Sequence, residues 1–224
     1  MNFMCRLGIC FLFLIFLGCN KEIPLQSYLA LGDSYTVGES VSKSERWPDQ
    51  LVASLANENI FLNSPEIIAK TGWTTSELQE GINLAPLNYP YDWVTLLIGV
   101  NNQYRGKSIE EFGSEFYKLL SQAIVFSGNR KERVFVVSIP DWGAMPFAIG
   151  NDIQKIAAEI DAFNQVIYEL CAQENVQFID ITSLSRKVSD YPDWIAKDGL
   201  HPSSAQYSKW VIEILPFFLN TKND

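Results

Sequence analysis

Short apolar segments alternate with longer amphipathic segments along most of the chain, and this alternation restricts the possible folds more than any other feature. The apolar segments have the length and the β-branched or aromatic content of buried strands. Five such runs occur, at 27–31, 65–70, 93–98, 133–139 and 176–181. Almost continuous apolar strands indicate a parallel sheet that helices cover on both faces, so the sequence predicts an α/β fold.

The segments between the predicted strands have the spacing of amphipathic helices. Residues 47–58 form one helical pattern, and capping-box patterns at Ser108 and Ser203 mark the starts of two others. Asp152 can cap a further long helix, and Pro216 is expected to end the last one. The stretch 139–152, which precedes this helix, is rich in proline and glycine and is predicted to be a long loop.

The N-terminus has the pattern of a bacterial export signal. Arg6 precedes an apolar run at 7–17, which is shorter than the about 20 residues that a membrane-spanning helix needs. Gly18 and Cys19 follow, as in a lipobox, where the cysteine is diacylated and becomes the first residue. The alternative is an ordinary signal peptide with a chance cysteine. We expect an exported lipoprotein of a bacterial cell envelope, either periplasmic or surface-facing.

The remaining chain is expected to form one domain. Cleavage after a signal peptide at 1–18 would leave a short tether at 19–26 and a domain at 27–220, which no repeat or linker divides. With Cys19 lipidated, Cys171 would be the single free thiol, so no internal disulfide could form. Its place on the apolar face of a predicted helix favours a small buried hydrophobe.

The chain is acidic, with a formal net charge of −9. This charge argues against a nucleic-acid partner, because nucleic-acid binding relies on cationic contacts to phosphates. It also argues against a polybasic membrane contact, so any membrane attachment would depend on the lipid anchor alone.

His201 is the only histidine in the chain, and it follows the fifth predicted strand. An imidazole is the side chain best suited to move protons near neutral pH. Asp198 lies three residues upstream and can hold the ring if the chain turns sharply, which Gly199 and Pro202 favour. These residues therefore suggest a base with an orienting acid.

Three further blocks follow the first three predicted strands. Ser34 lies in a Gly-Asp-Ser turn, where a following helix N-terminus would offer N–H groups to a developing negative charge and Asp33 would support the turn. Gly72 follows the second strand and Asn101 follows the third. Taken singly, each is an ordinary turn or cap residue. Because parallel strands end at one edge of a sheet, the blocks together favour an active site there.

In order and content, these blocks resemble those of the SGNH hydrolases, or GDSL esterases and lipases. The resemblance implies a flavodoxin-like fold, a three-layer α/β/α sandwich with a five-stranded parallel sheet. It implies that Ser34 is the nucleophile, His201 the general base and Asp198 the orienting acid. The N–H groups of Ser34 and Gly72 and the side-chain amide of Asn101 would donate to the oxyanion.

One position departs from the family pattern, because Asn102 stands where the third block usually has aspartate. The oxyanion asparagine is intact, so we expect activity to survive. Asn102 and four aromatic residues in or near the predicted site loops are candidate substrate-binding residues. The aromatic residues form either an acyl or sugar platform or the edge of the core. They are Trp73, Tyr104, Trp142 and Trp194.

The sequence thus predicts a serine esterase that uses a Ser-His-Asp triad and an acyl-serine intermediate. No cofactor is expected, because one histidine and scattered carboxylates make no transition-metal site and no glycine-rich phosphate loop occurs. Candidate substrates are acylated carbohydrates, lysophospholipids and other short-acyl esters. Two alternatives are a non-catalytic ligand-binding module on the same scaffold, for which Asn102 is the only hint, and a flavodoxin-like cofactor binder.

Overall fold

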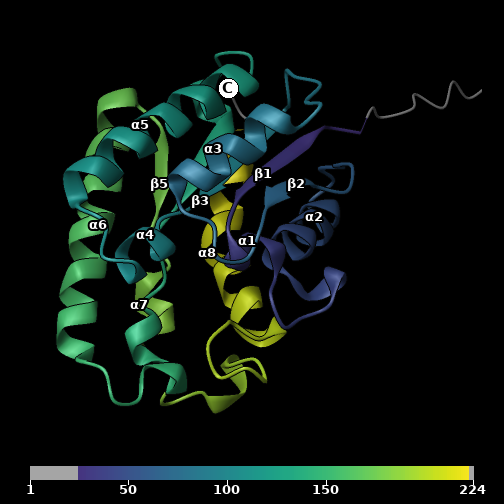
Figure 1. The fold of residues 1–224 in the computed structure, drawn as a ribbon. Helices are drawn as coiled ribbons and strands as arrows, with labels where there is room; N and C mark the ends of the chain where they lie inside the picture. The colour runs from purple at the N-terminus through teal and green to yellow at the C-terminus, as the bar shows by residue number, and fades with distance from the viewer. Residues whose placement is uncertain (1–24, 222–224) are drawn as a thin grey trace, which may run out of the picture.

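The computed structural model describes residues 25–221, and its centre is one parallel sheet (Figure 1). The sheet has five strands in the order β2-β1-β3-β4-β5, and every neighbouring pair is parallel. The strands are β1 Tyr28–Gly32, β2 Glu66–Ala69, β3 Trp93–Leu97, β4 Val134–Val137 and β5 Gln177–Ile179. The predicted five-stranded parallel α/β sheet is confirmed.

Helices cover both faces of this sheet, as the three-layer prediction requires (Figure 1). Helices α2 and α8 pack against each other on one face, whereas α5 packs against α3 and α6 on the other. The long helices are α2 Trp47–Asn57, α3 Thr75–Leu84, α5 Ile109–Phe126, α6 Ile153–Glu174 and α8 Ser204–Asn220. The short helices are α1 Ser34–Val37, α4 Val100–Tyr104 and α7 Thr182–Ser185.

The predicted starts of three long helices are confirmed. Ser108, Asp152 and Ser203 are the N-caps of α5, α6 and α8, respectively. Each side chain accepts a hydrogen bond from the backbone N–H three residues later, at 3.1, 3.0 and 3.4 Å. These bonds satisfy N–H groups that have no partner within the helix.

The prediction that Pro216 ends the last helix is wrong, because α8 continues beyond it. The proline lacks the N–H that would bond the carbonyl of Ile212. Ile212 lies on the solvent side of the helix, where water can satisfy that carbonyl. Beyond the proline, the fully buried Phe218 packs on Trp93 and Phe135, with ring centroids 4.5 and 4.4 Å apart. Burial of such a ring is worth about 2–3 kcal/mol, which offsets the lost bond.

The sequence patterns did not predict helix α3 or the two 3₁₀ turns before α6. Helix α3 begins with a capping box, in which the Glu77 carboxylate accepts from the Thr74 N–H at 2.8 Å and Thr74 accepts from the Glu77 N–H. That Thr-x-x-Glu spacing was a usable sequence signal. The predicted loop before α6 contains two single 3₁₀ turns, Trp142–Ala144 and Pro146–Ala148. Both turns prove to lie beside the predicted site.

Cys171 is fully buried in α6. Burial raises the pKa of its thiol to about 12, so the thiol stays protonated and unreactive near neutral pH. The interpretation of Cys171 as a small buried hydrophobe is confirmed. The expected signal peptide, Cys19 and most of the expected tether lie outside the described residues.

Candidate active site

The Gly-Asp-Ser turn after β1 places Ser34 at the first position of α1. Gly32 is required there, because a Cβ would lie 2.2 Å from Thr36 Oγ1 and 2.5 Å from the Leu97 carbonyl oxygen. Asp33 caps α1 by accepting the Tyr35 N–H at 3.0 Å, and its full burial raises the pKa of its carboxyl to about 7. Asp33 therefore supports the turn, as expected.

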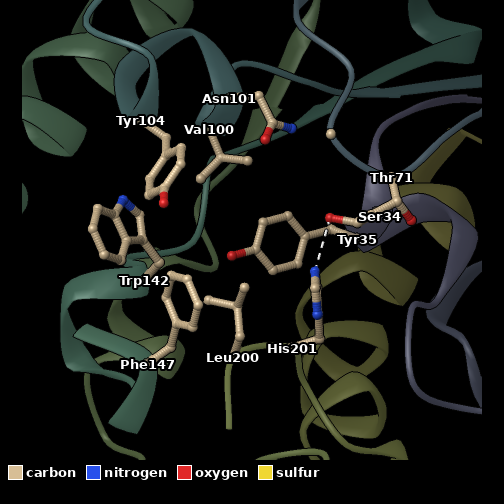
Figure 2. Close-up of a pocket in the computed structure, with 11 residues that line it drawn as sticks. Ser34, Tyr35, Thr71, Val100, Asn101, Tyr104, Trp142, Phe147, Leu200 and His201 are labelled. Atoms are coloured by element: carbon tan, nitrogen blue, oxygen red, sulfur yellow. Dashed lines mark hydrogen bonds between the residues drawn. The ribbon is translucent and has the colours of Figure 1, made fainter. Parts of the chain in front are cut away.

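Ser34, His201 and Asp198 form one hydrogen-bonded chain. The Ser34 Oγ lies 2.9 Å from His201 Nε2, and the His201 Nδ1 lies 2.6 Å from Asp198 Oδ2 (Figure 2). Asp198 Oδ1 also accepts the N–H groups of Leu200 and His201, at 2.9 and 3.0 Å. Gly199 adopts a φ of 72°, which allows this tight turn. The structure thus brings Ser34 next to the His201–Asp198 pair, although Ser34 and His201 are 167 positions apart in the sequence.

Ser40 is a fourth member of this series of hydrogen-bonded side chains, and the sequence did not indicate it. Its Oγ donates to Asp198 Oδ2 at 2.7 Å, so it shares that oxygen with the His201 ring. Ser40 has a φ of 67°, in the left-handed region that is uncommon for residues other than glycine. No sequence signal could reveal this contact, because it joins residues 158 positions apart.

The hydrogen bonds to Asp198 determine its charge. Partial burial alone would raise the pKa of the carboxyl, but the bonds from Ser40, the His201 ring and two backbone N–H groups together hold that pKa well below its usual range. Asp198 therefore stays ionised at every pH at which an imidazole changes charge.

The three predicted oxyanion donors line the same cavity as His201. The Ser34 N–H is in the first turn of α1, where it has no acceptor within the helix. Gly72 has a φ of 86°, and Arg105 fixes its carbonyl with a hydrogen bond of 2.6 Å. The Asn101 amide nitrogen donates one hydrogen to the Trp73 carbonyl at 2.9 Å, which leaves its second hydrogen available.

The cavity beside Ser34 has a volume of about 160 Å³, and its walls are largely apolar. Tyr104 and Trp142, both predicted, line it with their rings in an edge-to-face contact of 5.3 Å between centroids. The Trp142 Nε1 donates to Gln103 Oε1 at 2.8 Å, which fixes the indole. Sequence reasoning missed five of the lining residues, namely Tyr35, Thr71, Val100, Phe147 and Leu200 (Figure 2).

Trp73 and Trp194 do not line this cavity. The Trp73 ring covers Gly81, where a Cβ would lie 2.2 Å from the ring. Trp194 is buried and stacks on Tyr191, with centroids 4.3 Å apart and planes at 12°. Both tryptophans pack at the edge of the core, which was the alternative considered for them.

Asn102 is also absent from the cavity walls, because it is fully buried behind Asn101. Its Oδ1 accepts the Thr75 N–H at 3.0 Å, and its Nδ2 donates to Thr75 Oγ1 at 2.6 Å. The Thr75 hydroxyl in turn donates to the Glu115 carboxylate. Asn102 therefore ties α4 to the start of α3, so its presence in place of aspartate does not favour the binding-module alternative.

Within 25–221, no three histidine, cysteine, aspartate or glutamate side chains are grouped so that they could hold one.

Comparisons with known proteins identify the fold and the family of the chain. No curated protein matches the chain significantly. Similar solved structures include TesA, with a TM-score of 0.68, 19% identity and coverage of 88% of this chain and 99% of that one. A psychrotrophic esterase, EstA from Pseudoalteromonas sp., has a TM-score of 0.67 at 14% identity and covers 89% of this chain and 100% of that one. Axe2, an acetylxylan esterase from Geobacillus stearothermophilus, has a TM-score of 0.62 at 17% identity and covers 88% of this chain and 93% of that one.

At these identities the solved structures establish the shared fold. The assignment to a family comes from the sequence itself, which matches the model of the GDSL-like lipase/acylhydrolase family over residues 30–209. This range contains Ser34, Ser40, Asp198 and His201 and also the three residues predicted to bind an oxyanion. The protein therefore belongs to the GDSL-like lipase/acylhydrolase family of ester-hydrolysing enzymes.

Proposed function

We propose that this enzyme is a serine esterase that cleaves carboxylic esters through an acyl-serine intermediate on Ser34. The observation that supports this most is the 2.9 Å contact between Ser34 Oγ and His201 Nε2. A serine hydroxyl is a weak nucleophile until a base takes its proton. The arrangement supplies that base at hydrogen-bond distance.

The reaction then has two halves. Ser34 Oγ attacks the ester carbonyl carbon while its proton passes to His201 Nε2, and the tetrahedral intermediate collapses as His201 gives that proton to the leaving alcohol. Water next attacks the acyl carbon and gives a proton to His201. The carboxylic acid leaves when Ser34 Oγ takes this proton back.

The other site residues would stabilise the charges that form. The ionised Asp198 would keep a proton on His201 Nδ1, so that Nε2 presents its lone pair to Ser34, and would then stabilise the imidazolium. The Ser34 and Gly72 N–H groups and the Asn101 amide would bind the oxyanion. One such donor is typically worth about 10²- to 10³-fold in turnover.

The cavity supports a small substrate group at the reacting end. Its volume of about 160 Å³ is below the roughly 300–1,000 Å³ of typical ligand pockets. A short acyl group fits this size better than a long chain does. Acylated carbohydrates and other short-acyl esters are therefore favoured over lysophospholipids, and the fold shared with an acetylxylan esterase makes acetylated carbohydrates the first class to assay.

A fluorophosphonate probe tests the proposed reaction. We expect the wild-type enzyme to hydrolyse p-nitrophenyl acetate and to bind one probe molecule covalently, which peptide mass spectrometry should place on Ser34. A wild-type protein that is neither labelled nor active would contradict the proposal.

The acid limb of the pH profile should depend on Ser40. The hydrogen bond from Ser40 is the strongest of those that lower the pKa of Asp198. Without it, the carboxylate holds the imidazolium proton more tightly, so the acid limb of kcat/KM should move to higher pH by a few tenths of a unit. Ser40→Ala and Ser40→Gly should both show this shift, although only glycine relieves the positive φ. The exposed Ser44→Ala is the control, and an unmoved limb in both Ser40 variants would contradict the prediction.

We further propose that residues 1–18 are a lipoprotein-type signal peptide and that Cys19 is lipidated, which would attach the enzyme to the cell envelope of a bacterium. Gln26 is already part of the folded domain, because its N–H donates to the Phe61 carbonyl at 2.8 Å, so the tether between Cys19 and the domain would be short. Mass spectrometry of the membrane fraction should find a diacylated N-terminal cysteine that Cys19→Ser removes. An unmodified Cys19 in the native protein would refute the anchor.

No helix within residues 25–221 is long and apolar enough to cross a membrane.

A further inference from the structure

Tyr35 directly follows Ser34 and forms part of the cavity wall. Its side chain is only 2% exposed, and its ring meets the His201 ring edge-on, with centroids 5.6 Å apart. Tyr207 donates to the Tyr35 carbonyl at 3.1 Å, and the buried Trp210 packs against the Tyr35 ring. These contacts fix the ring beside the reacting groups.

The Tyr35 hydroxyl points away from Ser34, toward the side of the cavity that Trp142 and Phe147 line (Figure 2). No group among residues 25–221 forms a hydrogen bond with it. The comparable buried tyrosines differ, because Tyr28 pairs with Thr95 Oγ1 at 2.9 Å and Tyr207 pairs with a carbonyl. Buried tyrosine hydroxyls usually find such a partner within the protein. The Tyr35 hydroxyl opens instead onto the cavity, where a substrate group can supply one.

The hydroxyl acts as a donor at every relevant pH. Burial raises the pKa of Tyr35 well above its ordinary value, and the negative charges of Asp33, Asp141 and Asp198 raise it further. The phenol therefore keeps its proton and can donate it to an acceptor oxygen in a bound substrate. Val100, Phe147 and Leu200 contribute only apolar side chains to the cavity walls, and the Tyr104 hydroxyl, which also lines the cavity, forms no hydrogen bond with Tyr35.

We propose that the Tyr35 hydroxyl binds an acceptor oxygen in the part of the substrate that lies against the Trp142 and Phe147 side of the cavity. This assignment rests on the proposed esterase function and narrows its substrate class to oxygen-bearing esters. The acceptor is an ether, hydroxyl or carbonyl oxygen in either the acyl part or the alcohol part. A purely hydrocarbon group of the same size would leave the hydroxyl without a partner and would react more slowly.

Two pairs of esters distinguish the acyl part from the alcohol part. The acyl pair is p-nitrophenyl methoxyacetate and p-nitrophenyl butyrate. The alcohol pair is 2-methoxyethyl acetate and butyl acetate, whose hydrolysis is measured by the release of protons. Within each pair an ether oxygen replaces a methylene group. The quantity to measure is the ratio of kcat/KM for the two members, compared between the wild type and Tyr35→Phe, because this comparison cancels their different intrinsic reactivities.

In one pair or the other, Tyr35→Phe should lower this oxygen-to-methylene ratio by about three- to tenfold, the usual value of one neutral hydrogen bond. The pair that responds identifies the part of the substrate that carries the acceptor. Tyr28→Phe is the matched control, since it also removes a buried hydroxyl but one on β1 outside the cavity, and it should leave both ratios unchanged. The melting temperature of Tyr35→Phe should stay close to that of the wild type, because no hydrogen bond to another described residue is lost.

Unchanged ratios in both pairs, in a Tyr35→Phe enzyme that still hydrolyses all four esters, would overturn the assignment of Tyr35 alone. A wild-type protein that hydrolyses neither these esters nor p-nitrophenyl acetate would instead overturn the proposed esterase function.

Discussion

Replacement of Ser34 by alanine should abolish ester hydrolysis, with kcat lower by on the order of 10⁶-fold, as found when a triad enzyme loses its nucleophile. Alanine keeps the helix start of α1 and its Ser34 N–H but removes the only hydroxyl oxygen that contacts His201 Nε2. The fold should survive, because the change deletes one small polar atom. Covalent labelling by a fluorophosphonate should disappear in parallel.

Stopped assays on p-nitrophenyl acetate, with intact-protein mass spectrometry for the label, would measure both effects. Ser208→Ala is a suitable control, because Ser208 bonds its own helix carbonyl on α8 at 2.7 Å, and this variant should keep full activity. If Ser34→Ala retained more than about a hundredth of the wild-type rate, the acyl-serine mechanism would be wrong.

His201→Gln should cause a loss of comparable size, on the order of 10⁵- to 10⁶-fold in kcat. A glutamine amide can still form a hydrogen bond near Ser34, but it cannot accept the serine proton. The chain has no second histidine that could replace this base. The residual rate should also lose the acid limb of its pH profile, since Asp198 stays ionised across that range.

Chemical rescue separates the loss of a base from damage to the fold. His201→Ala leaves space beside Asp198, so added imidazole should restore part of the activity, and rescue should rise with the fraction of neutral imidazole. Ser34→Ala, treated in the same way, should show no rescue. A His201→Gln enzyme within tenfold of the wild-type rate would exclude His201 as the base.

The amino-acid sequence was sufficient for the framework and for the motifs that carry Ser34, Asp198 and His201. Strands and helices are encoded by local hydrophobic spacing, so the sheet, the caps at Ser108 and Asp152 and the position of Ser34 after β1 were predictable. Pro216 was misjudged because the distant burial of Phe218 outweighs a local helix-breaking preference.

Only the tertiary structure decided what surrounds the reacting groups. Tyr104 and Trp142 line the cavity whereas Trp73 and Trp194 pack at the edge of the core. The sequence cannot separate them, because all four are large aromatic residues in or near segments that it predicts to be loops. Ser40 contacts Asp198, and the Tyr35 hydroxyl points toward Trp142 and Phe147. Both arrangements join segments that are far apart in the chain, which no local pattern encodes. The sequence thus determined the family and the motifs that carry the proposed chemistry, because these are local patterns, whereas long-range packing determined the shape and polarity of the cavity.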